Sequence, residues 1–146
     1  MSTPYFEDVQ VGYKLPELVK GPVTPLALVR YSGACGDFNP IHTVPDVARS
    51  VGLDGVIAHG MLLMAYAGQM LTDWAEPSEL RRFKVRFRGM TVPGESLRCE
   101  AKITKRIEDA TSGEARVEGR LTVTGVDDDT LKLKGDFEVA LPRRSG

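Results

Sequence analysis

The segment from Gly60 to Trp74 constrains the fold more than any other part of the chain. Apolar side chains would cover much of its circumference as a helix, and several small residues would keep that helix slim. Its single charged residue, Asp73, stands near the far end. A helix of this kind has to be covered on most sides, so we expect the rest of the chain to be built around it.

Almost everything after Glu79 has the alternation of β-strands. In residues 83–87, apolar side chains alternate with basic ones, which is typical of a sheet with one buried face. The same alternation returns in residues 97–104, 117–123 and 131–141. One buried helix followed by an antiparallel meander predicts an α+β fold, in which a curved antiparallel sheet wraps around one long central helix.

The first third of the chain is less regular. Residues 6–16 alternate weakly and predict a short edge strand or an extended arm. Thr24 and Pro25 predict the start of a helix, because threonine caps helix N-termini and proline suits the first helical position. One or two further helical turns are expected over residues 45–51, before a glycine.

Length and charge narrow the class of protein. A chain of 146 residues predicts one domain, residues 1–146, and a net charge of −1 gives no argument for nucleic-acid or anionic-membrane binding. Cys35 and Cys99 fit neither a disulfide framework nor a zinc site. The amino terminus lacks a signal-peptide pattern, and no apolar run reaches membrane-spanning length. We therefore expect a cytoplasmic protein with no membrane association.

Residues 31–42 contain the side chains that are most informative about chemistry. Asp37 and His42 are five positions apart, with the turn-forming pair Asn39–Pro40 between them. A fully extended chain would hold the two side chains roughly 16–18 Å apart, whereas a turn can bring both to one point. A carboxylate beside an imidazole can bind one water molecule and move its protons, because histidine titrates near pH ~6.5.

Residues 36–42 resemble the hydratase-2 motif of the MaoC-like dehydratases. They read Gly36-Asp37-Phe38-Asn39-Pro40-Ile41-His42. That family includes the R-specific enoyl-CoA hydratases and the catalytic subunit of the mycobacterial 3-hydroxyacyl-ACP dehydratase. The resemblance extends to residues 57–61, and more loosely to 85–87 and 92–95. It implies the hot-dog fold, which usually dimerises by joining two sheets edge to edge.

The resemblance also implies a hydro-lyase that acts on acyl thioesters. Asp37 would take a proton from water, and His42 would orient that water and protonate C2 of a trans-2-enoyl thioester. The reverse reaction would dehydrate a (3R)-3-hydroxyacyl thioester. We expect no cofactor and no metal, apart from the carrier, which is coenzyme A (CoA) or acyl carrier protein (ACP). We expect a homodimer, or a heterodimer with a second hot-dog subunit.

Three further residues are candidates near this pair. Addition to an enoyl thioester puts negative charge on its carbonyl oxygen, and the backbone N–H of Gly60 could stabilise that charge from the amino end of the buried helix. Gly60 could instead simply permit tight packing. His59 is a candidate for binding the substrate or for acting as a second acid. Alternatively, its role is structural, at the start of the helix or in a hydrogen bond to a backbone carbonyl. Asn39 either braces the turn or contacts the substrate.

Basic residues on the first predicted strand are candidates for holding the carrier. Lys84, Arg86 and Arg88 lie on one side of this strand. Among them we select Arg86 as the candidate for substrate binding. It would contact the phosphates of CoA or the acidic face of ACP. The alternative is an ordinary solvated face.

Other functions stay open from the sequence. A hot-dog thioesterase generally has its working carboxylate on or near the central helix, where this chain has no acid before Asp73. A non-catalytic acyl-CoA-binding hot-dog protein would not need the pair of Asp37 and His42. Cys35 with His42 as its base would make an acyl transferase. No P-loop, GxGxxG or HExxH motif supports nucleotide, redox or zinc-protease chemistry.

Overall fold

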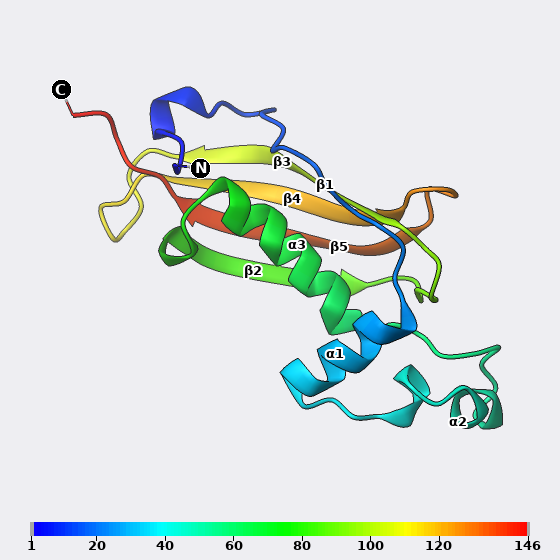
Figure 1. The fold of residues 1–146 in the computed structure, drawn as a ribbon. Coiled ribbons are helices and arrows are strands. Elements are labelled where there is room, and N and C mark those ends of the chain that lie inside the picture. The colour runs from blue at the N-terminus through cyan, green and yellow to red at the C-terminus, as the bar shows by residue number, and fades with distance from the viewer. Residues whose placement is uncertain (1, 146) are drawn as a thin grey trace.

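The computed structural model describes residues 2–145. A five-stranded antiparallel sheet curves around one long helix, α3 (Gly60–Trp74), and is not closed into a barrel (Figure 1). The strands are β1 (Leu18–Lys20), β2 (Leu80–Phe87), β3 (Leu97–Ile107), β4 (Arg116–Gly125) and β5 (Leu131–Ala140). The predicted α+β architecture, with a sheet wrapped around a central helix, is confirmed.

The order of the strands differs from the expected meander. It runs β1-β3-β4-β5-β2, so β2 pairs with β5 and not with the strand that follows it. Phe83 of β2 lies opposite Phe137 of β5, for example. The expectation of neighbour-to-neighbour pairing was wrong for β2, because alternation fixes which face is buried and leaves the choice of partner open.

The amino-terminal arm contains little strand. Residues 6–16 form a single 3₁₀ turn, η1 (Phe6–Asp8), and an isolated bridge between Lys14 and Lys102. The edge strand β1 comes later than the predicted segment. Phe6 and Val9 are nevertheless fully buried, so the weak alternation marks an extended arm that packs on the core.

Two helices flank the segment that contains Asp37. Helix α1 (Pro25–Cys35) begins as predicted, since the Thr24 hydroxyl accepts a hydrogen bond from the Ala27 N–H at 3.1 Å. It ends at Gly36, whose φ of 77° is left-handed and favours glycine. Helix α2 (Pro45–Ser50) is short and follows a 3₁₀ turn, η2 (Pro40–His42). The motif segment therefore connects two helices and belongs to neither.

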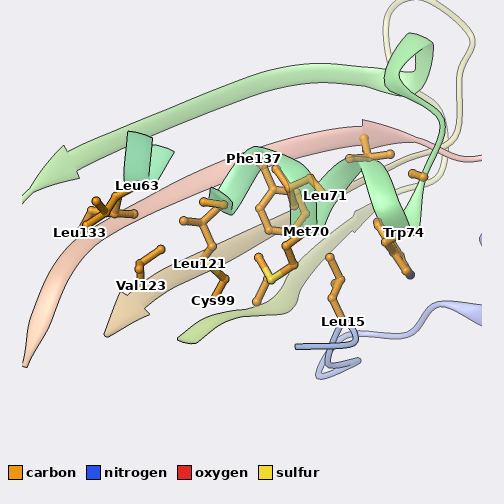
Figure 2. Packing of buried hydrophobic residues seen from close by; sticks show 14 of the residues in the cluster. Leu15, Leu63, Met70, Leu71, Trp74, Cys99, Leu121, Val123, Leu133 and Phe137 are labelled. Carbon is orange, nitrogen blue, oxygen red and sulfur yellow. The ribbon is translucent and has the colours of Figure 1, made fainter. Parts of the chain in front are cut away.

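The core lies between α3 and the concave face of the sheet (Figure 2). One side of α3 supplies Leu63, Met70, Leu71 and Trp74, and the strands supply Cys99, Leu121, Val123, Leu133 and Phe137. The other side of α3 is exposed along a stripe of residues: Met61, Ala65, Gln69 and Thr72. The other faces of α3 are buried or half-buried, so the prediction of burial on most sides is confirmed except for this stripe. Within residues 2–145, no helix combines the length and apolar composition needed to cross a membrane.

One glycine allows an aromatic ring to lie on the sheet. Gly119 of β4 is directly opposite Phe137 of β5, and a Cβ atom at Gly119 would lie 2.3 Å from that ring. It would also lie 2.8 Å from the carbonyl oxygen of Lys102, which belongs to the backbone and cannot rotate away. The packing of Phe137 therefore depends on the missing side chain.

We expect Gly119→Ala to lower the free energy of unfolding by about 1–3 kcal/mol, the usual range for overpacking a core. Gly33→Ala is the matched control, because no atom lies within 4 Å of the added Cβ and the position is in helix α1. It should leave the protein unchanged or stabilise it by about 0.5–1 kcal/mol. Urea unfolding followed by circular dichroism measures both, and equal midpoints for the two variants would contradict this account.

Candidate active site

Asp37 and His42 meet at the turn between α1 and α2. Asp37 Oδ2 and His42 Nε2 are 3.8 Å apart, and the Asp37 side chain is 51% exposed while that of His42 is 9% exposed. Asn39 shapes the turn, because its N–H donates to Asp37 Oδ1 at 3.1 Å and its own Oδ1 accepts from the Ile41 N–H at 3.2 Å. The gap of 3.8 Å is too long for a strong direct hydrogen bond and suits one water molecule that contacts both groups.

The ring of His42 is held in one orientation. Its Nδ1 lies 2.7 Å from the carbonyl oxygen of Ile57, and a carbonyl can only accept, so Nδ1 is the donor. The Ile57 N–H in turn donates to the Ile41 carbonyl at 3.2 Å. These two bonds attach the turn to the segment that enters α3. They leave Nε2 directed toward Asp37 as the atom that can exchange a proton.

His59 lies behind the pair. It is 2% exposed, and its ring stacks on that of His42 with centroids 3.8 Å apart and planes inclined by 23°. Its Nε2 is 3.1 Å from the Ser32 hydroxyl and 3.3 Å from the carbonyl oxygen of Asp37. The bond to a backbone carbonyl, an alternative left open by the sequence, is therefore present. Its contact with substrate stays a prediction.

The surroundings of His59 favour its uncharged form. Burial lowers the pKa of His59 below its usual value, and the neighbouring His42 acts in the same direction. The carbonyl and the charge of Asp37 oppose this lowering. Because Nε2 donates to the Asp37 carbonyl, the proton of neutral His59 is on Nε2 and its buried Nδ1 has no partner within residues 2–145.

Gly60 begins α3 with its N–H uncommitted. No acceptor for this N–H is found within residues 2–145, and the preceding His59 gives the helix no side-chain cap. A Cβ at Gly60 would lie 3.1 Å from the ring of Phe87, so a larger residue would have to displace that ring. The helix end thus presents a free donor, which fits the predicted role, but the packing role is equally visible.

A buried ion pair supports the wall beside this helix end. Lys132 is 4% exposed, and its Nζ lies 2.7 Å from Glu95 Oε1 and 2.9 Å from the carbonyl oxygen of Met90. The loop held in this way includes Thr91, whose carbonyl accepts the Ala58 N–H at 2.8 Å. The pair therefore fixes the strand-like segment immediately before His59 and Gly60.

Sequence reasoning missed Lys132. Alternation assigns it to the exposed face of its strand, since apolar residues stand on either side of it. The pairing of β4 with β5 is irregular near this point, between Val123 and Thr124, and Lys132 is buried. No signal in the sequence marks such an irregularity, so this supporting residue could not have been found without the structure.

The pair and His59 together could be considered as metal ligands. Asp37, His42 and His59 each offer a ligand atom, and these atoms lie within 4.8 Å of one another. A histidine nitrogen binds a metal along a direction in the plane of its ring. Two stacked rings cannot direct such lone pairs to one ion unless one of them turns, so the arrangement fits proton transfer better than metal binding.

Arg86 is not brought to this site. It is exposed on the convex face of β2, whereas the next residue, Phe87, points its ring toward Gly60. Cys35 is nearer, with its Sγ accepting the Asp37 N–H at 3.4 Å. Asp37, His42, Asn39, His59 and Gly60 thus form one neighbourhood, and the part of Arg86 in substrate binding stays a prediction.

The sequence matches the MaoC like domain family over residues 9–126. It is 34% identical over 116 residues to the fatty acid synthase beta subunit pkiC of Emericella nidulans, covering 77% of this chain and 6% of that protein. It is 49% identical over 43 residues to the 3-hydroxyacyl-thioester dehydratase X of Mycobacterium tuberculosis, covering 30% of this chain and 15% of that protein. The chain therefore spans a small part of the length of these relatives.

Solved structures show the same fold. The unliganded R-hydratase PhaJ1 from Pseudomonas aeruginosa matches with a TM-score of 0.82 and 21% identity, over 96% of this chain and 86% of that one. The (R)-hydratase from A. caviae, described as involved in PHA biosynthesis, matches with a TM-score of 0.82 and 22% identity, over 93% and 99%. These similarities confirm the predicted hot-dog fold.

The lowered pKa of His59 makes stability depend on pH. In the unfolded chain histidine titrates near ~6.5, so acidification below that pH protonates the unfolded state first and lowers the free energy of unfolding. We expect the thermal unfolding midpoint of the wild type to fall more between about pH 8 and pH 5 than that of His59→Gln. Gln can still donate to the Asp37 carbonyl but does not titrate. Parallel pH profiles for the two proteins would contradict this assignment.

Proposed function

This chain belongs to the MaoC-like domain family, and from that premise we propose that it adds water reversibly to trans-2-enoyl thioesters. In the reverse direction it removes water from (3R)-3-hydroxyacyl thioesters. The observation that carries the proposal is the approach of Asp37 Oδ2 and His42 Nε2 to 3.8 Å beside the open end of α3. The names of relatives, a 3-hydroxyacyl-thioester dehydratase and two R-hydratases, support the class of reaction.

The water is activated between the two side chains. Asp37 takes one proton from it, and its oxygen forms the bond to C3 of the enoyl thioester. His42, protonated on Nε2, gives a proton to C2, so that H and OH have been added across the double bond. A proton then returns from Asp37 to His42. The Ile57 carbonyl stabilises the charged ring by accepting from Nδ1.

Negative charge on the thioester oxygen is stabilised by the N–H of Gly60. As the bond to C3 forms, electrons move toward the carbonyl oxygen, and a free N–H at a helix N-terminus interacts favourably with that charge. Removing one such donor typically costs roughly 3–4 kcal/mol of transition-state stabilisation. The ring of Phe87 takes the space where a side chain of Gly60 would lie, so a larger residue here would displace that ring beside the free N–H.

His59 positions the pair and does not react in this mechanism. Its Nε2–H holds the carbonyl of Asp37, and its ring forms the surface against which His42 rests. Because its pKa is lowered, it adds no second positive charge beside the protonated His42. Asn39 fixes the distance between the reacting groups through the two bonds of the turn.

We propose that a second hot-dog subunit completes the enzyme. The exposed stripe on α3 includes Met61, which is 54% exposed and next to Gly60, and β2 is a sheet edge of eight residues with free backbone groups. Both features are better satisfied against another chain than in water. The partner is a second copy or a related subunit, and the substrate reaches the pair as a CoA or ACP thioester.

Asp37→Asn and His42→Ala should each lower the turnover of crotonyl-CoA hydration by at least ~100-fold, the usual scale for acid–base groups. Each change removes one of the two groups that handle the protons of water. The loss of the enoyl absorbance in the ultraviolet measures the rate.

Asp46→Asn is the matched control, since it removes an acid of helix α2 whose side chain is 95% exposed. It should hydrate crotonyl-CoA at the wild-type rate. Circular dichroism and thermal unfolding establish that all variants are folded. Near-wild-type turnover by either variant of the pair would rule out the mechanism.

A further inference from the structure

The convex face of the sheet, opposite α3, carries basic side chains without acidic partners. All six are exposed, and within residues 2–145 none of them takes part in an ion pair or a side-chain hydrogen bond. This cationic band consists of Lys14, Lys84, Arg86, Lys102, Arg120 and Lys134. The net charge of the chain is −1, so this positive charge is local.

The band places like charges directly opposite each other on neighbouring strands. Arg86 of β2 faces Lys134 of β5, and Lys102 of β3 faces Arg120 of β4. Lys102 also faces Lys14 in the isolated bridge. Like charges in this position destabilise a sheet, so the band reduces the stability of the free protein.

The other end of the same face is built differently. Arg82 reaches Asp136, Glu118 and Glu138, and Arg116 is 2.8 Å from Glu138. Although Glu118 and Glu138 face each other on β4 and β5, each acid there lies within 3.9 Å of an arginine, as on an ordinary solvated face. Toward the cationic band the acids become fewer: Asp136, opposite both Lys84 and Arg120, and Glu100 are the two that lie among its six cations. Solvation alone therefore does not account for the cationic band.

The band follows a shallow trough across the sheet. One hollow of about 440 Å³ is lined by Lys84, Arg86, Arg120 and Lys134, and an adjoining one of about 260 Å³ by Lys14, Lys102 and again Arg120. Four spacings of about 4.8 Å separate the segments that contribute these residues, which gives a length of about 19 Å. Such a length exceeds what a single phosphate group needs.

The composition of the trough favours an acidic protein surface. Among residues 2–145, no aromatic side chain lines either hollow, so unpaired bases would have nothing to stack on. Two acids, Glu100 and Asp136, lie among the cations and would repel a uniform polyanion such as nucleic acid, whereas a protein face can leave gaps opposite them.

We propose that the cationic band docks the acidic face of a carrier protein that holds the thioester substrate on a phosphopantetheine arm. This inference rests on the proposed function. It specifies ACP rather than CoA as the carrier of the thioester. Arg86 ends the band and precedes Phe87, whose ring lies against Gly60. The Arg86 end of the band therefore lies at the end of β2 whose next residue contacts the candidate active site, and the arm of a carrier docked there would enter from this end.

The test uses Lys102→Glu combined with Lys134→Glu in the full chain. Each change puts an acid opposite a cation, Arg120 or Arg86, so the thermal unfolding midpoint of the free protein should rise. At low salt, kcat/KM for crotonyl-ACP should fall about tenfold or more. The value for crotonyl-pantetheine, which has neither carrier nor nucleotide, should stay within about twofold.

The matched control is Arg49→Glu combined with Arg144→Glu, which changes the net charge equally but away from the band. It should keep kcat/KM for crotonyl-ACP near the wild-type value. Salt of about 0.5 M should reduce the advantage of wild type over the band variant, because it screens exposed charges beyond a few ångströms.

Several results would overturn the docking proposal. An equal loss with crotonyl-CoA would assign the band to nucleotide phosphates, and an equal loss in the control would assign the effect to net charge. A rise in stability with unchanged crotonyl-ACP kinetics would make the band a solvated face. Displacement of ACP by an equimolar DNA duplex would favour nucleic acid. If wild type hydrates none of the thioesters, the proposed function fails, and calorimetric titration of crotonyl-ACP into both proteins still decides the docking.

Discussion

The hydrogen bond from His42 Nδ1 to the Ile57 carbonyl is the constraint on which the candidate site depends. His42 belongs to an irregular turn, and Ile57 belongs to the segment that enters the central helix. This bond and its companion between Ile57 and Ile41 fix the ring relative to the segment before α3, and the stacked ring of His59 supports it from behind. With it, the local turn that brings Asp37 and His42 together is attached to the segment that leads into Gly60 and α3. The imidazole of His42 thus contacts Asp37 of its own turn through Nε2 and the distant residue Ile57 through Nδ1.

Behind the candidate pair lie an uncharged histidine and a buried ion pair. His59 fills the space behind His42 and is held uncharged, while Lys132 and Glu95 hold the neighbouring loop through a buried charged contact. Such a pair adds little to net stability, because burying two charges costs nearly what their attraction returns, but loss of one partner would leave the other charge buried and unpaired. The loop, the helix end and the turn are thus connected by hydrogen bonds and an ion pair, and Asp37 is the more exposed member of the candidate pair.

Sequence reasoning succeeded where the determining interactions are local. The bounds of α3 and the turn at Asn39 follow from helix periodicity and from side-chain bonds that span two residues. It failed where distant segments decide. The pairing of β2 with β5 and the burial of Lys132 depend on register between strands far apart in the chain. His59 is intermediate: its motif could be read, but its place behind His42 required the fold.

The unequal exposure of Asp37 and His42 affects how protons would move in the proposed cycle. Asp37 is half exposed, so its proton equilibrates with bulk water, whereas His42 is shielded by the stacked His59 and the Ile57 carbonyl. In the proposed cycle, hydrogen delivered to C2 comes from the shielded store and is replenished through the carboxylate. A hydrogen isotope on His42 would then exchange with solvent only by way of Asp37. Part of the isotope left from one turnover would therefore be transferred to C2 in the next.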